Sequence, residues 1–178
     1  MTRSAKPTGH VVYEAPPDVE AVFHNFRTCE FATLARDGAP QTWPTIPFHQ
    51  HDDGRFLVTT SIGLPQKAYN VRRDGRVSLL FSDPTASGLI QPPTVLVQGD
   101  AVCPETVTTT VDGFEDALGR MFKRQPESAI YGSNPLMRYL MDWYYMRLTI
   151  YVTPQRILYW PRGDMTQQAQ AIQVSHVE

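Results

Sequence analysis

The sequence has 178 residues, of which 42% are hydrophobic and 19% charged, and its formal net charge is −2 at pH 7. This length supports one ordinary folded domain whose core needs neither a disulfide nor a metal. The near-neutral charge excludes a strongly basic surface for nucleic acid or anionic membranes. No apolar run approaches the length of a membrane-spanning helix, and residues 1–10 lack the apolar segment of a secretion signal.

The two cysteines, Cys29 and Cys103, are too few and too far apart for a disulfide framework or a zinc signature. We therefore expect two free thiols and a cytoplasmic location. No flanking motif marks Cys29 as a nucleophile, and we expect it to be a small buried hydrophobic residue.

The chain contains no internal repeat and no low-complexity tract. We expect a flexible N-terminal arm over 1–15, a single domain over 16–163, and a polar C-terminal tail over 164–178. A helical insert at about 105–145 is longer than the rest of the domain requires.

The first regular element is predicted to be an amphipathic helix over about 17–28. Pro17 and Asp18 are typical of a first helical turn, where a missing N–H is tolerated and negative charge is favourable. Hydrophobic residues follow at helical spacing, at Val19, Val22, Phe23 and Phe26.

Residues 31–60 are predicted to form a meander of three antiparallel strands. Asp37-Gly38 and Asp52-Asp53-Gly54 are hairpin turn signals. The middle strand, over 39–49, contains Pro44 and Pro47, which cannot donate ladder hydrogen bonds. We therefore expect that strand to be bulged or to lie at an edge.

Pro65 is expected to open a short helix that carries Lys67 and ends at Asp74-Gly75. Beyond it we expect strands over 76–82 and 94–102, helices over 112–125 and about 134–144, and strands over 148–152 and 156–160 joined by a turn at 153–155. The sequence thus predicts a mainly β (α+β) fold, an antiparallel split β-barrel of about six to seven strands with peripheral helices.

The five histidines are scattered, and only His49 and His51 share a strand face. No cluster of carboxylates or cysteines in the sequence completes a metal site around them. We expect two histidines that flank an exposed turn and no bound metal. Motifs for nucleotide loops, zinc proteases and serine hydrolases are absent from the sequence.

One segment has the composition of a phosphate site. The hydroxyls of Thr59, Thr60 and Ser61 end a strand, and a Gly-Pro turn then leads into the helix that displays Lys67. Hydroxyls, helix N-terminal N–H groups and an ammonium group are the donors that phosphate prefers. In the alternative interpretation, Thr59 and Ser61 only cap the turn and Lys67 is solvated.

The runs FATLARDGAPQTWPTIPF, DGRFLVTTS and NVRRDGRVSLLFSD occur in this order. Their order resembles the flavin-binding split-barrel superfamily, which includes pyridoxamine 5′-phosphate oxidases and reductases that depend on the deazaflavin F420. The resemblance covers about residues 30–103, and TPQRILYWP is similar to the closing strand of the group.

The resemblance implies a homodimer with cofactor sites between its subunits. It implies that the partner's side of each site draws on C-terminal residues, with Trp143, Tyr159, Trp160 and Arg162 as candidates. The cofactor-binding residues that it implies are Gln41, Trp43, Pro44, Thr45, Ile46, Thr59, Thr60, Ser61, Lys67, Arg72 and Trp160.

The chain departs from the group at two points. It lacks the C-terminal Arg-x-His motif of the phosphate oxidases, and Pro65 stands where some deazaflavin enzymes have a basic residue. The missing motif argues against a pyridoxamine 5′-phosphate oxidase itself. Because FMN is the broader cofactor of the superfamily and Pro65 removes one basic contact, the resemblance implies FMN, with F420 as the alternative.

The function it implies is an oxidoreductase that transfers hydride to or from a small conjugated or heteroaromatic substrate. No catalytic residue is identified, because the cofactor performs the hydride chemistry. Two alternatives remain open: a non-enzymatic protein that sequesters or senses a flavin, F420 or haem, and a dimeric barrel without a cofactor. Neither nucleic acid nor a membrane is an expected partner.

Overall fold

The computed structural model describes residues 7–108 and 147–177. Within these residues the chain forms mostly strands, with two α-helices and one short 3-10 helix. The elements are β1 (His10–Val12), α1 (Pro17–Asn25), β2 (Cys29–Leu34), β3 (Pro40–Thr45), β4 (Pro47–Gln50), β5 (Arg55–Ser61), α2 (Gln66–Arg73), β6 (Arg76–Phe81), β7 (Thr94–Val102), β8 (Val107–Thr108), β9 (Arg147–Trp160), η2 (Pro161–Gly163), β10 (Gln170–Ile172) and β11 (Ser175–Val177).

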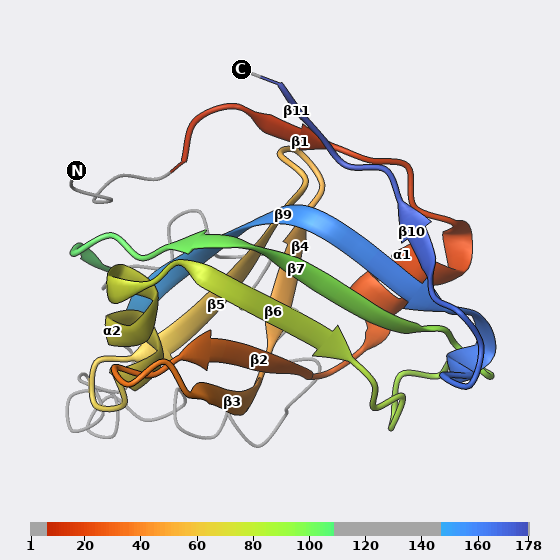
Figure 1. The fold of residues 1–178 in the computed structure, drawn as a ribbon, viewed down its shortest axis with the longest axis horizontal. Helices are drawn as coiled ribbons and strands as arrows, with labels where there is room; N and C mark the ends of the chain where they lie inside the picture. The colour runs from red at the N-terminus through yellow and green to blue at the C-terminus, as the bar shows by residue number, and fades with distance from the viewer. Residues whose placement is uncertain (1–6, 109–146, 178) are drawn as a thin grey trace, which may run out of the picture.

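The main sheet is antiparallel and has the strand order β3-β2-β6-β7-β9-β5-β4, with β8 and β10 paired to β9. It curls into a half-barrel, with α2 at one end and α1 packed toward the other (Figure 1). The predicted split β-barrel is therefore confirmed. Within the described residues, no helix is long and apolar enough to cross a membrane.

The predicted three-strand meander over 31–60 is wrong. The segment 39–49 breaks at Ile46 into β3, which pairs with β2, and β4, which pairs with β5. These two strands lie at opposite edges of the sheet. Pro44 and Pro47 flank the break, and their missing N–H groups favour the edge positions that were expected for this segment.

The predicted turn at 153–155 is also wrong, because β9 runs without a turn from Arg147 to Trp160. Its register against β7 shifts between Gln98 and Gly99, which pair with Arg156 and Pro154. Pro154 therefore lies in a bulged strand. A Cβ atom at Gly99 would lie 2.2 Å from the carbonyl oxygen of Thr153, so only glycine admits this close approach.

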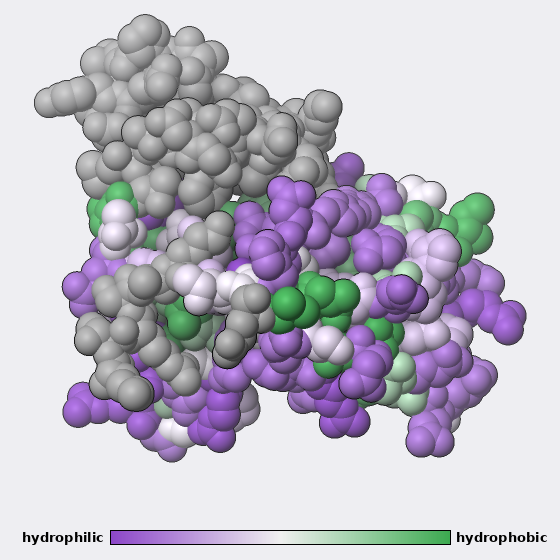
Figure 2. All heavy atoms as spheres, turned by 90° about the horizontal axis from the view of Figure 1, so that it is seen from above, coloured by the Kyte–Doolittle hydropathy of each residue, from purple (hydrophilic) through white to green (hydrophobic). Residues whose placement is uncertain are grey.

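The core lies on the inner face of the curled sheet, beneath α1 and α2. Phe23 of α1 meets Phe56 and Phe81 edge-on, with ring centroids 4.9 and 5.4 Å apart. Cys29 and Cys103 are both buried free thiols, as expected for Cys29 from the sequence. On the face shown in Figure 2, hydrophobic side chains form separate groups among hydrophilic ones.

Parts of the two end segments pair with each other in the structure. β1, in the expected loose arm, forms a two-stranded sheet with β11, in the expected polar tail. β10 of the same tail pairs with β9. The helices predicted at 112–125 and 134–144, and nearly all of the 105–145 insert, lie outside the described residues. The proposed domain boundaries stay a prediction.

Substituting Gly99→Ala tests the close approach between β7 and β9. The new Cβ would force the two backbones apart, so we expect the free energy of unfolding to fall by about 1–3 kcal/mol. Urea unfolding measures this loss. The exposed neighbour Gln98→Ala is the matched control and should stay within about 0.5 kcal/mol of the wild type. Equal stability of the two variants would contradict the bulge geometry.

Candidate functional site

The candidate site lies where β5 runs beyond its partner β4. β4 pairs with β5 only from Arg55 to Val58. Thr59, Thr60 and Ser61 continue past the start of β4 and keep β9 as their ladder partner on the other edge. The chain then turns at residues 62–65 and enters α2, which carries Lys67. A four-residue turn thus joins the strand end to the helix start.

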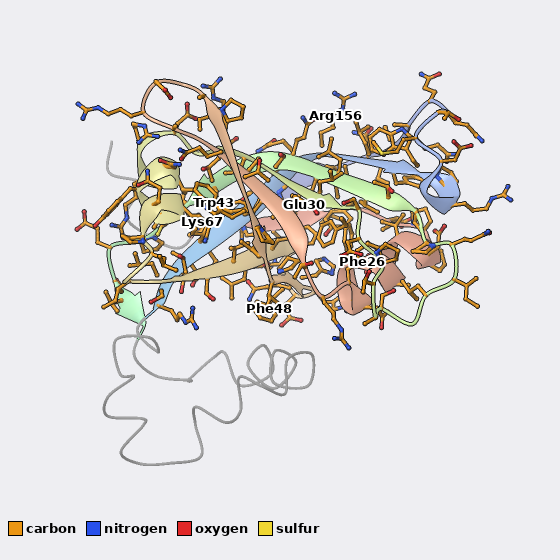
Figure 3. The ribbon with its side chains drawn as sticks, turned by 90° about the horizontal axis from the view of Figure 1, so that it is seen from below. Phe26, Glu30, Trp43, Phe48, Lys67 and Arg156 are labelled. Carbon is orange, nitrogen blue, oxygen red and sulfur yellow. The ribbon has the colours of Figure 1, made fainter. Side chains whose placement is uncertain are left out.

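Lys67 lies over the indole of Trp43, with its Nζ atom 5.4 Å from the ring centroid. Figure 3 shows the two side chains next to each other. This distance is within the range of a cation–π interaction. Burial lowers the pKa of Lys67, and the positive charge of Arg147 lowers it further. Lys67 is therefore half-buried beside a second cation.

Arg147 is a site residue that the sequence analysis missed. It begins β9 and is the ladder partner of Ser61. The sequence signal for β9 began at Leu148, and nothing in the sequence linked residue 147 to Lys67. Only the pairing of β5 with β9 reveals the juxtaposition. We call Trp43, Thr59, Ser61, Lys67 and Arg147 the Lys67 site.

The three hydroxyls that end β5 divide between the two faces of the sheet, because successive strand residues point in opposite directions. Thr60 lies on the inner face with the core, and its hydroxyl donates to the carbonyl of Leu64 at 2.8 Å. Thr59 and Ser61 lie on the other face. The Ser61 oxygen accepts the Gly63 N–H at 3.2 Å, which leaves its own O–H to donate elsewhere. The hydroxyl of Thr60 is thus used within the chain, whereas the Ser61 hydroxyl still has a proton to donate.

Asn70 anchors α2 to the sheet. This side chain is fully buried, and its amide nitrogen donates to Thr33 at 2.9 Å and to Gln41 at 3.0 Å. Its carbonyl oxygen accepts from Gln66 and Arg73. Gln41, a predicted cofactor residue, is thus already hydrogen bonded through its side-chain oxygen.

The remaining predicted residues of β3 have different surroundings. Pro44 is exposed and Ile46 is half-buried. Ile46 packs against Phe48 and Leu57 on the outer face of the sheet. Thr45 is buried, with its hydroxyl 3.5 Å from the sulfur of Cys29. The side chain of Thr45 is therefore directed into the core.

Arg72 is not brought to the Lys67 site. Its guanidinium donates to the carbonyls of Cys103 at 3.1 Å and Pro104 at 2.7 Å. Five residues along a helix turn the side chain by about 140° from Lys67. Arg72 therefore fastens α2 to the segment after β7.

Trp160 ends β9, whereas Arg147 begins it. Twelve strand residues lie between them, so the path from one to the other is about 43 Å. The next residues line a surface pocket of about 320 Å³, formed by Gln91, Pro161, Arg162, Asp164 and Gln167. Trp160 therefore lies at the end of β9 remote from the Lys67 site of the same chain. Trp143, another predicted partner-side residue, lies outside the described residues.

No protein-family model matches the sequence, and no curated protein matches it in sequence. The fold, in contrast, matches many solved structures. An F420 reductase is similar at a TM-score of 0.55 and 19% identity, over 80% of this chain and 98% of that one.

Two further solved structures show the same fold. A protein related to general stress protein 26, of the pyridoxinephosphate oxidase family from Clostridium acetobutylicum, has a TM-score of 0.52 and 9% identity, over 89% of this chain and 92% of that one. A haem-binding protein from Mycobacterium smegmatis has a TM-score of 0.53 and 17% identity, over 89% and 59%. The chain therefore has the split-barrel fold that these proteins share, as the resemblance of its motifs predicted.

Replacing Asn70 with alanine tests the anchoring of α2. The substitution removes the amide that donates to Thr33 and Gln41 and leaves the buried Thr33 hydroxyl without this partner, so the free energy of unfolding should fall by about 1–3 kcal/mol. Thermal or urea unfolding measures the change. Arg76→Ala removes an exposed ion pair with Asp74 and should cost much less. A loss at Arg76 as large as at Asn70 would contradict this anchoring role.

Proposed function

We propose that the chain binds FMN and acts as a flavin-dependent oxidoreductase. In this proposal Thr59, Ser61 and Lys67 hold the cofactor phosphate, and Arg147 adds a second positive charge. The cofactor ring lies along β3 and the break that follows it, at Gln41, Trp43, Pro44, Thr45 and Ile46. When bound, the flavin supplies hydride transfer to or from a small conjugated or heteroaromatic substrate.

The observation that carries the proposal is that Lys67 lies near a second cation, Arg147, whose ladder partner Ser61 keeps an O–H to donate. Lys67 and Arg147 are close enough that Arg147 disfavours the charged form of Lys67. A bound dianion would reverse this repulsion and favour both charges. Charge-assisted hydrogen bonds from Lys67 and the Ser61 hydroxyl match the chemistry of a phosphate group. The donors present therefore fit a phosphate-bearing cofactor.

β3 can contact the cofactor ring mainly through the side chain of Trp43 and through the backbone groups of the strand. β3 is an edge strand, so one side of its backbone has no ladder partner within the described residues. Gln41 is held by Asn70 and Thr45 points at Cys29, so these two residues would contribute N–H and C=O groups rather than side chains. Pro44 lacks an N–H and can offer only its carbonyl.

F420 is the alternative cofactor, because it also carries a phosphate and supplies hydride chemistry. A solved F420 reductase has the same fold. Pro65, however, occupies the N-cap of α2 and gives no charge to an anionic tail. This absence of a basic group two residues before Lys67 is why we favour FMN.

A protein that binds its cofactor without turnover is the second candidate. A haem-binding protein shares the fold, so the fold alone fixes neither cofactor nor catalysis. Reoxidation of the bound, reduced cofactor by an added quinone separates the two candidates. Accelerated reoxidation supports the enzyme, and binding at an unchanged reoxidation rate supports sequestration or sensing.

Trp160 can act in this site only if a second copy supplies it. It ends β9 about 43 Å of strand away from Arg147. We therefore propose a homodimer in which Trp160 of one subunit faces the Lys67 site of the other. Two exposed hydrophobic residues near Lys67, Leu64 and Tyr69, are 72% and 53% accessible in the single chain and are available for such a contact.

Substituting Lys67→Ala tests the phosphate site. Loss of one charge-assisted bond should weaken binding by about 1.5–3 kcal/mol, or about 10–150-fold in Kd. Parallel titrations with FMN and F420, followed by absorbance and fluorescence, measure the affinity. Arg76→Ala removes an exposed cation elsewhere and should bind as the wild type does. If the wild type binds neither cofactor, the proposal is wrong.

The dimer is tested by light scattering after gel filtration, which should give twice the chain mass of 20.1 kDa. Trp160→Ala should then weaken FMN binding without unfolding the protein, since Trp160 is only partly buried. If the protein has a monomeric mass at the concentration at which it binds FMN, the proposed role of Trp160 in the site is wrong.

A further inference from the structure

A second group of side chains gathers at the other end of β5, where α1 crosses the β4–β5 turn. Glu20 and His24 lie one helical turn apart on α1, His49 lies on β4 and His51 follows it in the turn. Each residue offers one ligand atom, and these four atoms all lie within 4.8 Å of one another. We call these four residues the histidine cluster.

The geometry of the histidine cluster is close to that of a metal site. Glu20 Oε2 lies 3.6 Å from His24 Nε2 and 3.8 Å from His49 Nδ1. Ligands at about 2.0–2.1 Å from a tetrahedral zinc ion are about 3.3–3.4 Å apart, so side-chain rotations must shorten these two distances and those of the other pairs, which lie within 4.8 Å. The ring of His51 stacks on His24 at 4.5 Å and meets His49 at 4.7 Å.

The chemistry of the donors fits one class of ion. Three imidazoles and one carboxylate suit divalent transition metals such as Zn²⁺ and disfavour Ca²⁺ and Mg²⁺, which prefer oxygen ligands. The cluster is also accessible, because His51 is exposed and the side chain of His24 is 40% accessible. An ion can therefore enter from solvent.

Two features of the cluster favour the binding of an ion. Glu20 Oε2 is shielded from solvent and accepts no hydrogen bond from the described residues. The hydroxyl of Tyr13 lies 2.7 Å from His49 Nε2, and the other ring nitrogen of His49 faces Glu20. A hydrogen bond to the outer nitrogen of a histidine fixes the orientation of the nitrogen that binds metal. Tyr13 stands in that position.

We propose that Glu20, His24, His49 and His51 bind one divalent transition-metal ion of the zinc type. The ion ties α1 to the β4–β5 turn and stabilises the fold at this end of the half-barrel. The histidine cluster is separate from the Lys67 site. His49 pairs with Phe56, whereas Ser61 lies five residues, or about 16 Å, further along β5 and on the opposite face. The proposal is therefore independent of any flavin.

The probe is Zn²⁺ added to the full chain after chelator treatment, with binding measured by calorimetry and thermal unfolding. We expect one ion per chain and a rise in Tm of about 5–10 °C at a 100-fold excess over Kd. Co²⁺ in place of Zn²⁺ should give the visible absorption of a tetrahedral histidine site. Absence of stoichiometric binding would overturn the proposal.

The accessible ligands supply the informative variants, because buried His49 could not be replaced without damage to the core. Tyr13→Phe removes only an outer contact and should weaken Zn²⁺ binding by about 10–100-fold. His24→Ala and His51→Ala each remove a ligand and should weaken Zn²⁺ binding by more than Tyr13→Phe does. His176→Ala removes an exposed histidine of β11 and is the matched control. If both ligand variants bind Zn²⁺ as tightly as His176→Ala does, the ion is held by surface histidines elsewhere and the proposal is wrong.

Discussion

The break of the chain at Ile46 is the constraint on which the rest of the structure depends. β3 and β4 are separated by one residue, yet they lie at opposite edges of the main sheet. The sheet must therefore curl until its two edges meet at this residue, which makes a half-barrel rather than a flat sheet. The same break leaves Thr59–Ser61 without β4 as a neighbour and creates the place where Lys67 approaches Trp43. Fold and candidate site thus share one cause.

Much of this fold is readable from local signals in the sequence. Turn dipeptides and apolar spacing predicted β2, β5, α2, β6 and β7 nearly at their observed bounds, because each of these elements is set by its own residues. The break at Ile46 and the bulge in β9 were missed. Both depend on the partner strand: Gly99 lets β9 continue past Pro154, and no pattern near Pro154 shows this.

The Lys67 site and the histidine cluster also differ in how much of each could be predicted from local sequence. Thr59, Ser61 and Lys67 lie within nine residues of one another, and their composition marked them as a site. Arg147 and the histidine cluster could not be found, since α1 and β9 bring together residues far apart in the chain. Local sequence around His49 and His51 predicts only two residues that flank a turn, because the helix that supplies Glu20 and His24 precedes them by 25 residues or more.

The pairing of β1 with β11 gives the molecule a latch made of its two end segments. A two-stranded ribbon is only marginally stable by itself, and the loop that it closes runs from residue 12 to residue 175. The two strands alone therefore hold the latch weakly, as in the segments of a protein that open most readily. β1 of the latch also touches the β4–β5 turn. The Val11 N–H donates to the carbonyl of Asp53, and the Val11 carbonyl packs against Gly54. Opening the latch would uncover that turn and free Tyr13 beside it, so the pairing of residues 10–12 with 175–177 bears directly on this corner of the molecule.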